Sequence, residues 1–227
     1  EGRIERARHV YSTHSGYYNK YTKKKLSADV KKFLDYFKAQ RPWYEKTKGR
    51  WDYQTDLLEF FCRTWRNKDE IHAIVDEMLG DLKNVKDEKD YEKRLIWIIH
   101  RLRDAWQTER ALHCITYLKS PIRAKWEEYW LFHRQRKWQE CLTRLDDLEG
   151  MGDEKTARSA KYQRAELYRE RVGKYQEAIK LYQELDNPPD TLWKVQDCYR
   201  RWGKLKDALQ TLTEIESSFP DHASRSE

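Results

Sequence analysis

The sequence predicts an all-α protein, an α-solenoid of antiparallel helix pairs with about eleven helices. Glycine and proline are scarce, with 8 and 5 residues, and they cluster at positions that bound stretches of helical length. Within these stretches apolar residues recur three or four positions apart, and no stretch alternates with period two for long. β-Branched residues are also few, so we expect no sheet.

Residues 1–26 form a basic N-terminal arm rich in Tyr and Lys. Residues 1–50 hold 14 Lys and Arg against 5 Asp and Glu, whereas the remainder holds 32 against 34. Lysine contacts phosphate and Tyr rings stack on bases, so the arm is a candidate nucleic-acid contact. The other interpretation is a solvated linker, or a basic first helix that packs on its neighbour. The candidate nucleic-acid residues are Tyr17, Tyr18, Lys20, Tyr21, Lys23, Lys24 and Lys25.

Residues 27–90 form an N-terminal helical region. Ser27 is a good helix start, and we expect a helix from there to about Gln40 that caps the array. Two further helices are expected over 52–66 and 69–84, and their apolar stripes predict that they pair with each other.

A repeat over 91–220 is the most informative feature of the chain. A small residue recurs at intervals of 30, 37 and 30, at Ala111, Cys141, Ala178 and Ala208. A large residue or Thr stands three positions before each, and apolar or aromatic residues stand four and seven positions after. One helix pair cannot bury its apolar face alone, but stacked pairs share a continuous core. We therefore expect four pairs, followed by a polar tail over 221–227, with bounds near 92–121, 122–152, 159–188 and 189–220.

The last two units carry a family resemblance. They read Gly173-Lys174-Tyr175-Gln176-Glu177-Ala178 and Gly203-Lys204-Leu205-Lys206-Asp207-Ala208, and Pro220 follows Ala208 by twelve residues. This pattern resembles, in divergent form, the tetratricopeptide repeat (TPR) family, whose repeat combines a turn Gly, an Ala and a closing Pro. The resemblance implies a superhelix whose first helices line a concave, ligand-binding groove. The alternative is a generic helical bundle.

The resemblance also selects groove residues. With first helices at 92–105, 122–135, 159–171 and 189–202, the groove mixes Trp with basic residues and His. Trp and Arg are enriched at binding hot spots, and Arg binds carboxylates with two parallel hydrogen bonds. We therefore expect an acidic or C-terminal segment of another protein as the partner. In the alternative interpretation, the Trp rings are core and the cations pair with neighbouring carboxylates. The groove candidates are Trp97, His100, Arg103, Trp126, Trp130, His133, Arg134, Arg164, Arg171, Trp193, Lys194, Arg200 and Arg201.

Several functional classes are not indicated. The sequence has no H-E-x-x-H, G-x-S-x-G, Gly-rich phosphate loop or C-x-x-C motif, so we expect no enzyme, no metal site and no cofactor. We interpret the four widely spaced cysteines, Cys62, Cys114, Cys141 and Cys198, as buried free thiols on helices. The longest apolar run, 95–99, is far too short to span a bilayer.

The sequence therefore predicts a protein-interaction scaffold that binds a partner peptide or helix in its groove. One alternative is a nucleic-acid-binding helical protein that uses the basic arm. A second is a self-assembling module of a larger protein, because residues 221–227 are too short to cap the last pair. The sequence does not determine the subcellular localisation, although we favour the cytoplasm. Because the chain starts at Glu1 rather than Met, processing or truncation of the N-terminus is one explanation.

Overall fold

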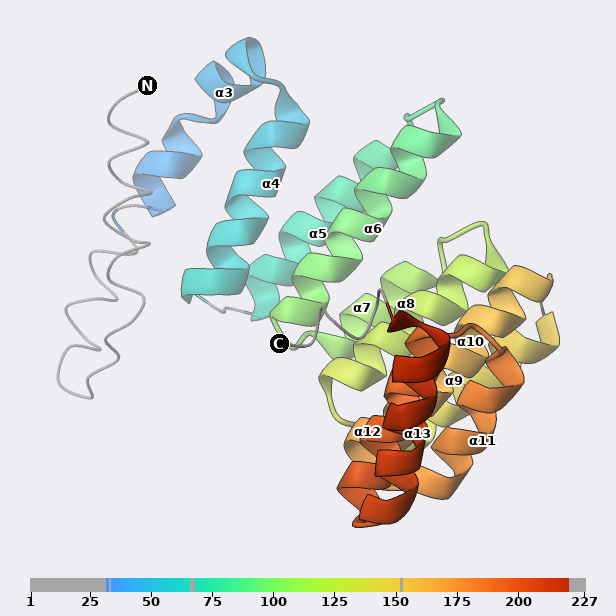
Figure 1. Ribbon diagram of the computed structural model, residues 1–227. Coiled ribbons are helices and arrows are strands. Elements are labelled where there is room, and N and C mark those ends of the chain that lie inside the picture. Colours follow the sequence, from blue (N-terminus) through green and yellow to red (C-terminus); the bar gives the residue numbers. More distant parts are fainter. Residues whose placement is uncertain (1–31, 33, 66–67, 152, 221–227) are drawn as a thin grey trace, which may run out of the picture. The chain divides into compact units, whose positions relative to one another are not determined.

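A computed structural model describes residues 32, 34–65, 68–151 and 153–220 (Figure 1). Within these ranges the protein is all-α, without a strand, and helices that follow one another in the sequence pack together. The fold class predicted from the sequence is thus confirmed. The basic arm, residues 27–31 and 33 of the helix predicted from Ser27, and the tail over 221–227 lie outside the described residues. The chain divides into two compact units, Glu1–Tyr117 and Leu118–Glu227.

Unit 1 is built around α4, α5 and α6. Residues 34–39 are helical and precede α3 (Arg41–Thr47). Next, α4 (Arg50–Phe60) continues as a π-helix, η1 (Phe61–Trp65), and packs on α5 (Lys68–Leu82), as predicted for 52–66 and 69–84. α6 (Glu88–Asp104) packs on α5 and pairs with α7 (Thr108–Ile115). The apolar stripes of α4, α5 and α6 are buried and form the core of this unit.

Unit 2 contains three successive helix pairs. α8 (Pro121–Arg134) pairs with α9 (Trp138–Met151). α10 (Glu154–Leu167) continues as a π-helix, η2 (Tyr168–Val172), and pairs with α11 (Tyr175–Leu185). α12 (Asp190–Trp202) pairs with α13 (Leu205–Ser218). The side chains of Ser120 and Asp153 accept hydrogen bonds from backbone N–H groups and so cap α8 and α10.

The predicted repeat is visible in the backbone. Each second helix, α7, α9, α11 and α13, begins three residues before the recurring small residue, and all four small residues are buried. Two residues before each second helix, the backbone enters the left-handed region, with φ between 60° and 79°. Only two of these four positions are glycine, and the full set is Trp106, Arg136, Gly173 and Gly203.

One hydrogen bond fixes the shape of each turn. The N–H that follows the left-handed residue donates to a carbonyl five residues earlier, as from Gln107 to Leu102 at 2.9 Å and from Lys204 to Tyr199 at 2.9 Å. In the turn after η2 the acceptor of Lys174 is Tyr168, six residues earlier, because the π-helix holds an extra residue. The repeat is therefore a backbone repeat as well as a side-chain pattern.

Candidate functional site

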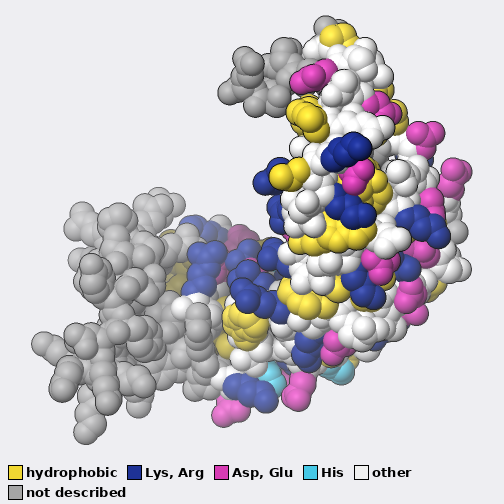
Figure 2. Space-filling model, turned by 60° about the horizontal axis from the view of Figure 1, so that its bottom comes forward, with side chains coloured by type: hydrophobic (Ala, Val, Ile, Leu, Met, Phe, Trp, Pro, Cys, Tyr) yellow, Lys and Arg dark blue, Asp and Glu magenta, His cyan; other side chains and the backbone are white. Residues whose placement is uncertain are grey.

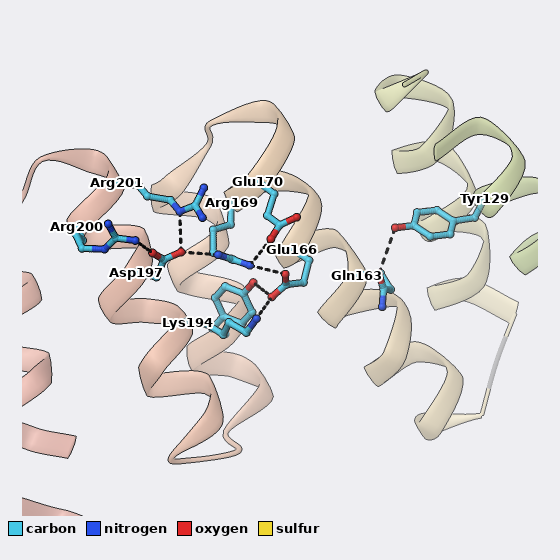
Figure 3. Close-up of polar contacts among 10 residues, drawn as sticks. Tyr129, Gln163, Glu166, Arg169, Glu170, Lys194, Asp197, Arg200 and Arg201 are labelled. Carbon is cyan, nitrogen blue, oxygen red and sulfur yellow. Dashed lines mark hydrogen bonds and ion pairs between the residues drawn. The ribbon is translucent and has the colours of Figure 1, made fainter. Parts of the chain in front are cut away.

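The three first helices of unit 2 are linked by side-chain contacts, and we call the surface that they share the first-helix face. Between α8 and α10, Tyr129 Oη donates to Gln163 Oε1 at 3.3 Å. Between α10 and α12, Lys194 Nζ lies 3.0 Å from Glu166 Oε1 (Figure 3). A second link runs from Arg169 of η2 to Asp197 of α12. α8, α10–η2 and α12 thus lie in sequence order along one face.

Aromatic rings of α8 and α9 form one end of the first-helix face. Tyr129 is buried, and its ring centroid lies 4.8 Å from that of Trp130 and 5.7 Å from that of Trp126. The ring of His133 lies 5.8 Å from Trp130 and 5.5 Å from Trp138. Trp130 keeps 38% of its surface exposed, so a large apolar ring held by its neighbours is open to a ligand.

His133 is uncharged at neutral pH. Burial lowers the pKa of its imidazole below the ordinary value, and the charge of Arg171 lowers it further. The ring therefore adds to the aromatic surface and offers hydrogen-bonding nitrogens, but it does not add a positive charge.

A network of charges occupies the other end of the face. Arg169 is only 6% exposed, and its guanidinium donates to Glu166 Oε2 at 2.6 Å, to Glu170 Oε1 at 2.8 Å and to Asp197. Burial raises the pKa of the Glu166 carboxyl, but hydrogen bonds from Tyr182, Arg169 and Lys194 outweigh burial and hold that pKa below its ordinary value. These groups remain ionised and hold η2 against α12.

Arg169 and Arg171 lie two residues apart in the π-helix and point to different sides of it. Residues 168–172 bond in the π pattern, so successive side chains turn by less than in an α-helix. Arg169 points into the carboxylates, whereas Arg171 is exposed and makes no ion pair with any residue in the described part of the chain. Arg169, Tyr129 and Glu166 are not among the predicted site residues, and for Arg169 the reason is that no sequence signal marks a π-helix.

Most cations predicted for the groove are paired within the protein. Arg200 and Arg201 both contact Asp197, the latter at 2.7 Å. Arg164 contacts Asp146 and also Glu149, at 3.2 Å. A carboxylate of a partner must therefore compete with carboxylates already in place. Figure 2 shows one face of the molecule, on which Lys and Arg side chains lie among hydrophobic and acidic ones.

The remaining predicted residues divide between the two units. Arg134 is exposed on α8, and Trp193 is half-buried on α12, on the same side as Arg200 by helical spacing. Trp97, His100 and Arg103 are half-buried on α6 and belong to unit 1. The arm residues Tyr17–Lys25 lie outside the described part of the chain.

Trp97 is held inside unit 1. Its ring centroid lies 6.2 Å from that of Trp51, and the guanidinium carbon of Arg101 lies 5.4 Å from the Trp97 ring centroid. Arg94 lies over Trp51 in the same way, at 4.7 Å. These stacked rings and cations stabilise the packing of α4 on α6.

The cysteines are free and buried, as predicted. Burial raises the pKa of Cys62, Cys141 and Cys198 to about 12 and that of Cys114 to about 11, so the thiols stay protonated at neutral pH. Among the described residues, no group of three or more His, Cys, Asp or Glu side chains could hold a metal ion. The described helices also include none with the length and apolarity needed to cross a membrane.

No protein-family model matches the chain. No curated protein matches it either.

Proposed function

We propose that this protein is an interaction scaffold, a divergent TPR-like repeat that binds a segment of another protein on the first-helix face. The observation that carries the proposal is the chain of contacts from Tyr129 through Gln163 and from Glu166 to Lys194, which supports a continuous surface across three helices. The repeated turn before every second helix supports the TPR-like assignment.

The chemistry of the face favours a segment with both an apolar anchor and acidic groups. Trp130 offers exposed aromatic surface, and Arg171 is an exposed cation without an ion pair among the described residues. Arg200 and Arg201 share one carboxylate, Asp197, so the three groups carry a net positive charge. Such a surface attracts an acidic or C-terminal segment, while the Trp ring supplies most of the binding free energy.

The test compares face variants with matched controls. Trp130→Ala and Arg171→Glu are made on the face, and Trp202→Ala and Lys206→Glu are made away from it. Trp202 is a close match because it is also 38% exposed. Each full-length variant is immobilised, and proteins captured from the native lysate, with and without nuclease, are quantified by mass spectrometry.

We expect the face variants to lose the captured proteins and the controls to keep them, with unchanged far-UV circular dichroism in all four. Equal capture by all variants would overturn the assignment of the face. Capture that disappears with nuclease would instead favour nucleic-acid binding, for which the basic arm is the candidate.

A second candidate function is self-association through α13. Leu205 and Leu209 stand one helical turn apart and are 68% and 64% exposed, an unusual exposure for two leucines on one face. A second copy docked there would bury both. Sedimentation equilibrium of the wild type and of Leu209→Lys measures the oligomeric state and tests this candidate. If both proteins are monomers at high concentration, self-association through α13 is ruled out.

A further inference from the structure

A groove lies on the other side of α12 from the first-helix face. It has a volume of about 560 Å³ and runs between the C-terminal half of α11 and the length of α13, with α12 as its floor. On α12 the groove is lined by Thr191, Val195 and Tyr199, whereas Asp197 of the first-helix face projects from the opposite side of the helix by helical spacing. The volume is in the range of about 300–1,000 Å³ typical of ligand sites.

The charge of the groove is entirely acidic. Among the described residues that line it, three carry carboxylates, Asp186, Asp207 and Glu214, and none is Lys, Arg or His. None of the three carboxylates forms an ion pair with a residue that the structure describes. On the first-helix face, by contrast, Glu166, Glu170 and Asp197 are all paired. The groove carboxylates are therefore available to a cationic ligand.

The rest of the lining suits a long cationic side chain. Leu192, Tyr199 and Phe219 are partly exposed and offer apolar and aromatic surface, which can pack against the methylene stem of Lys or Arg. Gln183 and Gln210 add hydrogen-bonding groups beside the carboxylates. A nucleic acid is disfavoured, since its phosphates would be repelled by three unpaired carboxylates.

We propose that this groove binds an extended, Arg- or Lys-containing peptide segment of a partner protein, with the cationic heads on Asp186, Asp207 and Glu214. The site is separate from the first-helix face. Variants of Trp130 or Arg171 should leave it unchanged, and its failure would leave the proposed function standing.

The binding test uses full-length protein and a fluorescein-labelled octapeptide of alternating Arg and Ala residues, measured by fluorescence anisotropy. The same peptide with Glu in place of Arg is the ligand control. The groove variant is Asp207→Asn with Glu214→Gln, and Glu214→Gln alone serves if the double variant loses helicity. The matched control is Glu177→Gln with Glu216→Gln, which changes the net charge equally. Both control residues are exposed, outside the groove, and Glu177 holds the same position in α11 that Asp207 holds in α13.

We expect the Arg peptide to bind, the Glu peptide not to bind, and the groove variant to weaken binding about tenfold or more, which is about 1.4 kcal/mol. The control variant should change the affinity less than about twofold. Equal weakening in both variants, or no binding by the wild type, overturns the proposal.

A further full-length variant, with Lys23, Lys24 and Lys25 changed to Gln, tests whether the chain's own basic arm occupies the groove. If it binds the peptide much more tightly than the wild type, the groove belongs to the chain's own arm, and the assignment to a partner is wrong.

Discussion

Arg169 should be among the most costly side chains to remove in unit 2. The Arg169→Met change keeps an unbranched, flexible stem but removes the guanidinium, which contacts Glu166, Glu170 and Asp197. Removing one partner of a buried ion pair lowers the free energy of unfolding by about 3–5 kcal/mol. Glu166 retains Lys194, and Asp197 retains its two arginines on α12, so we expect the low end of this range, about 3 kcal/mol.

The assay is equilibrium urea denaturation followed by far-UV circular dichroism. Arg171→Met is the matched control, because this residue belongs to the same π-helix and is exposed. We expect the control to change the free energy of unfolding by less than about 0.5 kcal/mol. A loss below about 1 kcal/mol in Arg169→Met, or no difference between the two variants, would refute the view that the network holds η2 against α12.

Three further predictions concern the turns, the thiols and the dependence of stability on pH. Gly203 has φ of 79° and free space around its missing Cβ, so Gly203→Ala should cost about 1 kcal/mol, whereas Arg136→Gly should stabilise by up to about 1 kcal/mol, both read from urea midpoints. The four buried cysteines should react with a thiol reagent only in urea, and rapid reaction in the native protein at neutral pH would contradict their burial. The folded-state pKa values of Glu166 and Asp197 are held below their ordinary values of 4.5 and 3.8, so these groups stabilise the protein above those values, and this stabilisation is lost as the pH falls through the lowered folded-state pKa values. In Arg169→Met this loss should be smaller, and an identical pH profile would show that these carboxylates are not the cause.

The sequence predicts the helices and their repeat well because both depend on spacing. Ala178 and Ala208 stand where second helices cross closely, and the frame that they define predicts where α11 and α13 begin. The arrangement of cations was not predictable in the same way. The π-helix η2 shifts the positions of Arg169 and Arg171 around the helix relative to α10, and hydrophobic periodicity gives no signal for this shift.

The acidic groove shows a second limit of sequence reasoning. Asp186, Asp207 and Glu214 belong to three different segments, and each one alone is an ordinary surface carboxylate. Only the packing of α11 and α13 on α12 brings these three carboxylates into one groove. The excess of basic residues in the first 50 positions also directs attention away from an acidic site.

The shared turn geometry makes the helix pairs interchangeable in principle. Trp106 and Arg136 adopt the left-handed conformation that Gly173 and Gly203 adopt, so the chain leaves each first helix through a left-handed residue at the same position, whichever residue type stands there. A pair could then be duplicated, deleted or transplanted within the array without redesigning its corner, provided that the side chains of the new neighbours fit. The turn within each pair therefore places little constraint on the rest of the sequence, and substitutions can accumulate on the helix surfaces between the turns.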